Sequence, residues 1–140
     1  MIFPEGTNLT KETKEKSDKF AEINKLKPYN QVLYPRVTGF THIYNEMDKN
    51  CQIDCIHDVT VAYRGGHIPE AEKDFINAKL PEEIHFFIEK FDCKSLFDSE
   101  TKGENRNKKI ESWLNERWRL KEEFLNKYAS KFRLSFIYLI

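Results

Sequence analysis

The amino-acid sequence predicts a mixed fold of the α/β or α+β class, because two different hydrophobic periodicities occur along it. Apolar residues alternate with other residues from Ile53 to Tyr63, which is the pattern of a strand. Between Lys108 and Phe132 they recur at helical spacing and form a broad stripe. The length of 140 residues suits one domain or a piece of a larger one, and it excludes two full domains.

The composition excludes several classes of protein. Lys plus Arg and Asp plus Glu each total 23, so the formal net charge is +0. A dedicated binder of duplex nucleic acid carries an excess of cations, so we expect no nucleic-acid partner. A hydrophobic content of 39% is enough for a core, which excludes disorder throughout the chain. No apolar run approaches the roughly 20 residues of a spanning helix, so we expect any contact with a bilayer to be superficial.

The first third of the chain predicts a helix and then a short strand. Thr10 is a suitable N-cap for a helix from Lys11 to Leu26, which the Lys27-Pro28 pair ends. The apolar run from Gln31 to Tyr34 predicts a strand that Pro35 stops.

A weaker helical pattern spans Thr38 to Lys49, and the clearest strand of the sequence follows it. One face of that strand carries Ile53, Cys55, His57, Val59, Val61 and Tyr63. The other face carries mostly polar residues, namely Asp54, Asp58, Thr60 and Arg64. The Gly65-Gly66 pair ends the strand.

The region between this strand and the last helix predicts three further segments. These are a short helical turn from Pro69 to Ala78, a strand from Glu83 to Phe91 and a polar loop from Asp92 to Asn107. The strand has Ile84, Phe86 and Ile88 on one face and Phe87 and Phe91 on the other. Apolar residues on both faces predict a buried strand.

The helix from Lys108 to Phe132 allows two interpretations. Its stripe consists of Ile110, Trp113, Leu114, Trp118, Phe124, Leu125, Tyr128 and Phe132. Interleaved Lys and Arg are typical of a helix at a membrane interface, but intervening Glu residues dilute the charge, and we favour packing on a sheet. The tail from Leu134 to Ile140 is too short to span a bilayer, and apolar residues at both ends suggest a cut from a longer chain.

The cysteines predict no metal site. An odd number of them without a secretory signal predicts free thiols in a reducing compartment. Cys51, Cys55 and His57 lie close together in the sequence, but a structural zinc site needs four ligands, usually as two close pairs. The sequence contains no second pair, so we expect no metal.

The segment Phe3-Pro4-Glu5-Gly6-Thr7 is the first with chemical content. Ile2 and Phe3 look like the end of a strand, Pro4 keeps the chain extended, and Gly6 permits a close ligand approach. Glu5 then stands at a strand end beside backbone N–H groups and hydroxyls, where α/β proteins bind ligands. The alternative is a plain strand-turn-helix connection with Thr10 as its cap.

This segment resembles the third conserved block of the glycerolipid acyltransferases, which acylate lysophosphatidic acid and other lysophospholipids from acyl-CoA. The stretch Val32-Leu33-Tyr34-Pro35-Arg36-Val37-Thr38-Gly39-Phe40 is similar to the fourth block of the lysocardiolipin and related lysophosphatidic acid acyltransferases. Five further segments resemble the C-terminal region of the same branch, namely His57 to Tyr63, Ile68-Pro69, Glu83 to Phe86, Trp113 and Arg117-Trp118. Order and spacing agree across nearly the whole chain.

The resemblance implies an acceptor site with Glu5 and Gly6 at the lysolipid's head group or glycerol hydroxyl, and Phe3, Pro4 and Thr7 shaping the turn. Many members of the family have an Arg directly after the Thr, where it can pair with a phosphate. Asn8 stands there instead, which agrees better with the lysocardiolipin-like branch. Pro35 matches the proline of the fourth block, and we expect Arg36 to make a compensating phosphate contact. The alternative is an exposed arginine on a turn.

The general base of the family is missing from this sequence. The family is understood to use a His, oriented by an Asp five positions later, to take the proton of the acceptor hydroxyl. None of His42, His57, His67 and His85 has an Asp at that distance. His57 and Asp58 point to opposite faces of a strand, and His42 and Asp48 lie on different faces of a helix. We therefore assign no catalytic residue and expect the chain alone to be inactive.

The resemblance implies three parts. Residues 1–50 would be the C-terminal part of the acyltransferase sheet-and-helix domain, 51–133 an extension of two strands and a long helix, and 134–140 a truncated apolar tail. The implied activity is acyl-CoA-dependent lysophospholipid O-acylation of the lysophosphatidic acid or lysocardiolipin type, in phospholipid synthesis or remodelling. Acyl-CoA would be a co-substrate, with no further cofactor, and the full-length protein would associate with the endoplasmic reticulum membrane. The rival is a non-catalytic module that binds a membrane surface or a partner protein.

Overall fold

The computed structural model describes residues 1–64, 80–97 and 103–132 of the chain. Its elements are helix α1 (Lys11–Ile23), helix α2 (Val37–Lys49), strand β1 (Cys55–Arg64), strand β2 (Glu83–Asp92), helix α4 (Cys93–Leu96) and helix α5 (Glu104–Phe132). The mixed class predicted from the sequence is confirmed. The predicted turn at 69–78 and the apolar tail at 134–140 lie outside the described residues.

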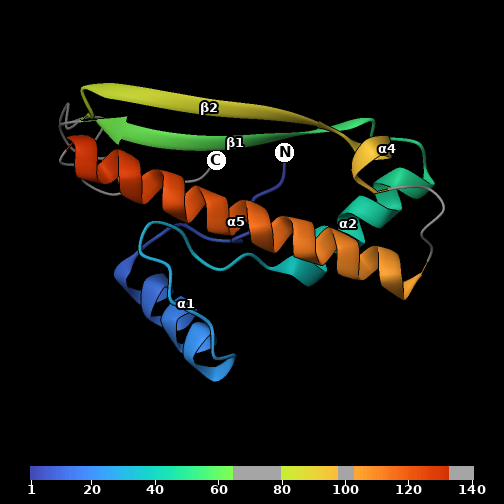
Figure 1. The fold of residues 1–140 in the computed structure, drawn as a ribbon, viewed down its shortest axis with the longest axis horizontal. Helices are drawn as coiled ribbons and strands as arrows, with labels where there is room; N and C mark the ends of the chain where they lie inside the picture. Colours follow the sequence, from blue (N-terminus) through green and yellow to red (C-terminus); the bar gives the residue numbers. More distant parts are fainter. Residues whose placement is uncertain (65–79, 98–102, 133–140) are drawn as a thin grey trace.

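Helix α5 is the axis of the fold. Figure 1 shows it running along nearly the whole molecule, with the two strands along one side and α1 on the other. Helices α2 and α4 lie beside the end at which α5 begins. This placement lets α5 contact α2 and both strands.

The predicted stripe of α5 forms much of the apolar core. Four of its residues are buried, at a spacing that keeps them on one side of the helix, namely Ile110, Leu114, Trp118 and Leu125. They cluster with Phe40 and Tyr44 of α2, Phe97 after α4, and Val32 of the irregular segment before α2. The stripe therefore packs inside the protein, which was the favoured interpretation.

The two strands form an antiparallel pair in which both predicted strands are confirmed. Thr60 lies opposite Phe87 and Val61 opposite Phe86, so each pair shares one face of the sheet. Phe87 contacts Phe124 of α5 at a ring-centroid distance of 4.4 Å, and α5 therefore covers the face that also carries Asp58 and Thr60. The more polar face of β1 is the one turned toward the long helix.

The prediction that β2 is buried on both faces is wrong. Ile84, Phe86 and Ile88 are 50%, 57% and 62% exposed. The long helix covers only the opposite face, where Phe91 meets Trp113 at 5.5 Å between ring centroids. Large apolar side chains on the uncovered face form an exposed apolar strip, which we define as Ile84, Phe86 and Ile88.

The predicted strand at Gln31 to Tyr34 is also wrong, because side-chain oxygens accept hydrogen bonds from backbone N–H groups of this segment. The backbone N–H groups of Asn30 and Gln31 each donate to the carboxylate of Glu122 at 2.7 Å. The backbone N–H of Tyr34 donates to the Ser17 hydroxyl at 3.0 Å. The segment is irregular, and its apolar residues serve the core without joining a sheet.

Local capping explains the starts of α1 and α4. The side chains of Thr10 and Thr13 form a reciprocal capping box at the start of α1, as a cap at Thr10 predicts. The predicted loop at 92–107 contains the short helix α4, because the Asp92 side chain accepts a hydrogen bond from the backbone N–H of Ser95 at 2.9 Å. Helix α5 begins four residues earlier than predicted, at Glu104.

We expect Asp58→Asn to lower the free energy of unfolding by about 3 to 5 kcal/mol, because it removes the carboxylate that neutralises a buried cation. Asp58 Oδ1 lies 2.6 Å from Nζ of Lys121, whose side chain is only 2% exposed. Urea unfolding followed by circular dichroism measures the change.

A matched control is Asp18→Asn, which breaks a partly exposed i,i+4 pair with Lys14 and should cost no more than about 0.5 kcal/mol. Adding Lys121→Met to Asp58→Asn should restore part of the lost stability, since no unpaired charge is then buried. Equal effects of the Asp58 and Asp18 substitutions would contradict this account.

Candidate functional site

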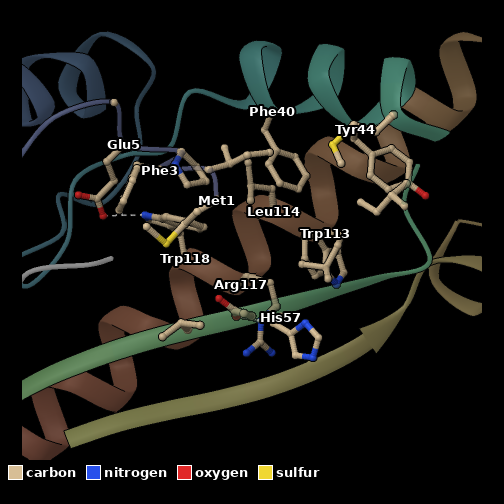
Figure 2. A pocket seen from close by; sticks show the side chains of 18 of the residues that line it. Met1, Phe3, Glu5, Phe40, Tyr44, His57, Trp113, Leu114, Arg117 and Trp118 are labelled. Atoms are coloured by element: carbon tan, nitrogen blue, oxygen red, sulfur yellow. Dashed lines mark hydrogen bonds and ion pairs between the residues drawn. The ribbon is translucent and has the colours of Figure 1, made fainter. Parts of the chain in front are cut away.

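A cavity of about 990 Å³ lies between the N-terminal segment, α2, β1 and α5. Figure 2 shows Phe40 and Tyr44 entering it from α2 and Trp113, Leu114 and Trp118 from α5. Most of its walls are apolar, and its polar lining residues include Glu5, Thr7, Asn8, Thr10, His57, Asp58 and Arg117. A large apolar volume with a few polar groups is the usual composition of a small-molecule site.

The predicted site residues Phe3, Pro4, Glu5, Gly6 and Thr7 all line this cavity. Their backbone forms a turn closed by a hydrogen bond from Gly6 N–H to the Phe3 carbonyl at 2.9 Å. Gly6 has a φ of +71°, a left-handed conformation in which a side chain is strained. The turn directs Glu5 inward, so the segment is more than a connection to α1.

Pro35 and Arg36 lie beside this turn but do not line the cavity. The backbone N–H of Arg36 donates to the Pro4 carbonyl at 2.7 Å. A Cβ atom at Gly6 would lie 3.1 Å from Nε of Arg36, so the guanidinium group packs on the glycine. The structure thus joins the two predicted blocks, and a phosphate contact by Arg36 stays a prediction.

Glu5 is the buried carboxylate of the cavity, at 8% exposure. The indole N–H of Trp118 donates to Oε1 of Glu5 at 2.9 Å, the dashed line in Figure 2. Burial raises the pKa of Glu5 from 4.5 to about 7, against hydrogen bonds from Trp118 and the backbone of Leu33 and the charge of Lys121, which lower it. A group with this pKa changes charge near neutral pH.

A buried ionic network lies next to Glu5 on α5. Arg117 donates through Nε to Oδ2 of Asp58 at 2.7 Å and pairs also with Glu89. Lys121 donates to the Thr60 hydroxyl at 2.6 Å as well as pairing with Asp58. Burial lowers the pKa of Lys121, and the Asp58 carboxylate opposes that effect. The network ties α5 to β1 along one wall of the cavity.

Sequence reasoning missed the partners of Glu5 and Asp58. Trp118 belonged to the apolar stripe, and no sequence signal distinguishes an indole that donates to a carboxylate from one that only packs. Asp58 was considered only as a partner for His57. The structure separates these two: Asp58 faces α5, whereas Nδ1 of His57 lies 3.9 Å from the Cys55 sulfur on the other face.

The other histidine and cysteine groupings form no ligand cluster among the described residues. Asp48 pairs with Arg106 at 2.7 Å, so it is engaged away from His42. In the ranges 1–64, 80–97 and 103–132, no three His, Cys, Asp or Glu side chains are placed to hold a metal ion.

Curated proteins with similar sequences are acyltransferases. Lysocardiolipin acyltransferase 1 of Gallus gallus is 40% identical over 128 residues, which are 91% of this chain and 32% of the relative. Lysophosphatidylinositol acyltransferase 10 of Caenorhabditis elegans is 35% identical over 132 residues, or 94% of this chain and 32% of the relative. Probable 1-acyl-sn-glycerol-3-phosphate acyltransferase 5 of Arabidopsis thaliana is 33% identical over 129 residues, or 92% of this chain and 32% of the relative.

The chain is similar to glycerolipid acyltransferases over about 91% of its own length. The resemblance predicted from the sequence is therefore confirmed. The chain spans about a third of the length of these acyltransferases. No family model and no solved structure matches it.

The described helices are not of the membrane-crossing kind. Helix α5 is 29 residues long but carries many charged side chains. Within the described ranges, no helix has both the length and the apolar content that crossing a bilayer requires.

We expect the stability of the protein to fall as the pH rises through the interval between the unfolded and folded pKa values of Glu5. The folded state retains a proton on Glu5 between about pH 4.5 and pH 7, where the unfolded state has lost it. The ionisation of Glu5 therefore lowers the free energy of unfolding by roughly 3 kcal/mol across that interval. Glu5→Gln keeps the acceptor for Trp118 and removes the charge, so the variant should become more stable than the wild type above pH 7.

Urea-unfolding midpoints of both proteins between pH 4.5 and 8.5 measure this difference. Comparing the two proteins cancels the contributions of groups that do not interact with Glu5. A constant difference in stability across the whole range would show that Glu5 does not titrate as proposed.

Proposed function

We propose that this chain forms the acceptor-binding part of an acyl-CoA-dependent lysophospholipid O-acyltransferase of phospholipid synthesis or remodelling. The observation that carries the proposal is that Phe3 to Thr7 line a large apolar cavity and place Glu5 at a polar position in its wall. The names of the relatives specify lysocardiolipin, lysophosphatidylinositol and 1-acyl-sn-glycerol-3-phosphate acyltransferases. Lysophospholipids of these types are the proposed acceptors.

The chemistry of the cavity suits a lysolipid. Its apolar walls, which include Phe40, Leu114 and Trp118, match an acyl chain, and Glu5 offers acceptor oxygens to a hydroxyl group. In the proposed reaction the hydroxyl oxygen attacks the thioester carbonyl of acyl-CoA, the carbon–sulfur bond breaks, and free CoA leaves as the thiol. Acyl-CoA is a co-substrate, and the proposal includes no further cofactor.

The proposed acceptor preference follows from the cations near the cavity. Asn8 lines it where many relatives of the family have an Arg, and Arg117 is already paired with Asp58 and Glu89. Arg36 lies beside the turn and is the proposed contact to a phosphate. This arrangement favours a lysophospholipid of the lysocardiolipin type, with its hydroxyl at Glu5, over a phosphate monoester.

We propose that the chain by itself is catalytically inactive. Its four histidines include none with an Asp five positions later. His85 is engaged by Glu83 at 2.7 Å and by the Tyr128 hydroxyl at 2.6 Å, so it is poorly placed to act on a ligand of the cavity. The general base would come from a segment that the longer relatives have and this chain does not include. The full-length protein is proposed to associate with endoplasmic reticulum membranes. Residues 1–50 would complete that catalytic domain, and residues 51–133 would extend it.

A second candidate function is a non-catalytic module of the same family that docks on a membrane surface or a partner protein. The exposed apolar strip of Ile84, Phe86 and Ile88 favours it, because large apolar side chains on one strand face seldom stay uncovered without a role. Binding assays on the cavity and on the strip separate the two candidates.

The intrinsic fluorescence of the protein should report lysolipid binding directly. The sequence has two tryptophans, and both Trp113 and Trp118 line the cavity. Short-chain lysophosphatidylinositol, below its micelle concentration, should shift the emission saturably, and Glu5→Ala should weaken the apparent affinity by roughly tenfold.

Two substitutions outside the cavity make the controls. Ile23→Ala alters an exposed residue of α1 and should bind like the wild type. Phe86→Asp should also leave the emission response unchanged. Suppose that Phe86→Asp abolishes binding to phosphatidylcholine vesicles and that neither the wild type nor any variant shows a saturable lysolipid response. The non-catalytic module is then the correct function, and the proposed acceptor site is wrong.

The purified chain should show no acyl transfer from radiolabelled oleoyl-CoA to lysophosphatidylinositol or lysophosphatidic acid. The nucleotide sequence upstream of the Met1 codon provides an independent test. An open frame encoding a His, four residues and an Asp supports the enzyme, and in that longer protein Glu5→Ala should reduce acceptor use. Acyl transfer by the purified chain would refute the proposed inactivity.

A further inference from the structure

The contact between Trp118 and Glu5 joins residues 113 positions apart in the sequence. Both side chains are buried, with 5% and 8% of their surface exposed, and both line the cavity. We propose that Trp118 is a positioning residue, whose indole N–H holds the Glu5 carboxylate in the orientation that receives the acceptor hydroxyl. This inference rests on the proposed function and adds helix α5 to the acceptor site.

An indole suits this task because it can donate one hydrogen bond and accept none. It occupies Oε1 of Glu5 at 2.9 Å. A carboxylate has about four acceptor positions, so after the bonds from Trp118 and the backbone of Leu33 acceptor capacity remains for a hydroxyl group. A donor that could rotate, such as a serine hydroxyl, would fix the carboxylate less firmly.

The indole is itself held in place. Nζ of Lys121 lies 5.5 Å from the centre of the Trp118 ring, and Lys121 is fixed by Asp58 and by the Thr60 hydroxyl. Arg117, the preceding residue on α5, is bonded to the same aspartate. Trp118 is therefore supported by a network that reaches β1, and movement of α5 would be transmitted to Glu5.

A purely structural hydrogen bond would also stabilise a buried carboxylate. Its loss would lower stability but would leave the geometry of acceptor binding unaffected. The two roles differ in whether Trp118 and Glu5 are coupled in ligand binding. Both roles require the contact itself, which the indole signal reports because it senses the charge of Glu5. The contact and the coupling can both be measured without an active enzyme.

Nuclear magnetic resonance tests the contact between Trp118 and Glu5 on the intact chain. Two tryptophans give two indole N–H signals. The Trp118 signal should shift between pH 5 and pH 8 as Glu5 titrates, and this shift should vanish in Glu5→Gln, whereas the Trp113 signal should shift little. If the unfolding measurements show that Glu5 titrates in this range and neither signal follows the pH, or if the shift persists in Glu5→Gln, the proposed contact does not exist.

Calorimetric titration with short-chain lysophosphatidylinositol tests the coupling of Trp118 and Glu5 in ligand binding. Trp118→Phe keeps an aromatic ring and removes the donor, and it should weaken binding by roughly tenfold. The double variant Glu5→Ala, Trp118→Phe should bind no more weakly than Glu5→Ala alone, because the two residues act as a unit. Trp113→Phe is the matched control, and its effect should add to that of Glu5→Ala.

The outcomes separate this inference from the proposed function. Equal affinities of the wild type and Trp118→Phe, or additive effects of Glu5→Ala and Trp118→Phe, would overturn the positioning role while the acceptor site stands. Absence of lysolipid binding by the wild type would overturn the proposed function and, with it, any acceptor role of Trp118. If Trp118→Phe fails to fold, the pH dependence of the wild-type indole signals still decides whether the contact exists.

Discussion

The structure depends on the polar groups that α5 buries. An ionised side chain inside a protein is several kcal/mol unfavourable unless a partner neutralises it. Helix α5 buries Lys121 and Glu122, and each is satisfied by a segment distant in the sequence. Asp58 and Thr60 of β1 receive Lys121, and the backbone N–H groups of residues 30 and 31 donate to Glu122. Ion pairs and hydrogen bonds to these buried groups therefore hold the helix, the sheet and the N-terminal region together, in addition to apolar contacts.

The candidate site is a consequence of the same helix. Trp118, next to these ions, meets Glu5 and brings the turn at Phe3 to Gly6 against the core. The carboxylate is thereby buried, and its pKa rises to about 7. In a chain similar to the glycerolipid acyltransferases, this arrangement connects the segment proposed to bind the acceptor with the long C-terminal helix.

The sheet shows how the polarity of a strand is set by its neighbour. The Asp58 face of β1 is covered because α5 offers Arg117 and Lys121 to it. The apolar strip of Ile84, Phe86 and Ile88 faces away from α5 and stays exposed among the described residues. Hydrophobicity alone would bury the apolar strip and expose the Asp58 face. The ion pairs of Asp58 with Arg117 and Lys121 offset the cost of burying the polar face instead.

The sequence by itself determined the elements whose signals are local. Thr10 marked the start of α1, alternation marked β1, and helical periodicity marked α5, because caps and side-chain periods act over a few residues. The Phe3 to Thr7 segment and the family were also identifiable from neighbouring residues. Only the tertiary structure decided the rest: the irregular path at Gln31 to Tyr34, the exposed face of β2, and the partners of Glu5 and Asp58. Each of these depends on a contact between residues far apart in the chain, and sequence periodicity carries no information about which distant side chain will satisfy a buried polar group.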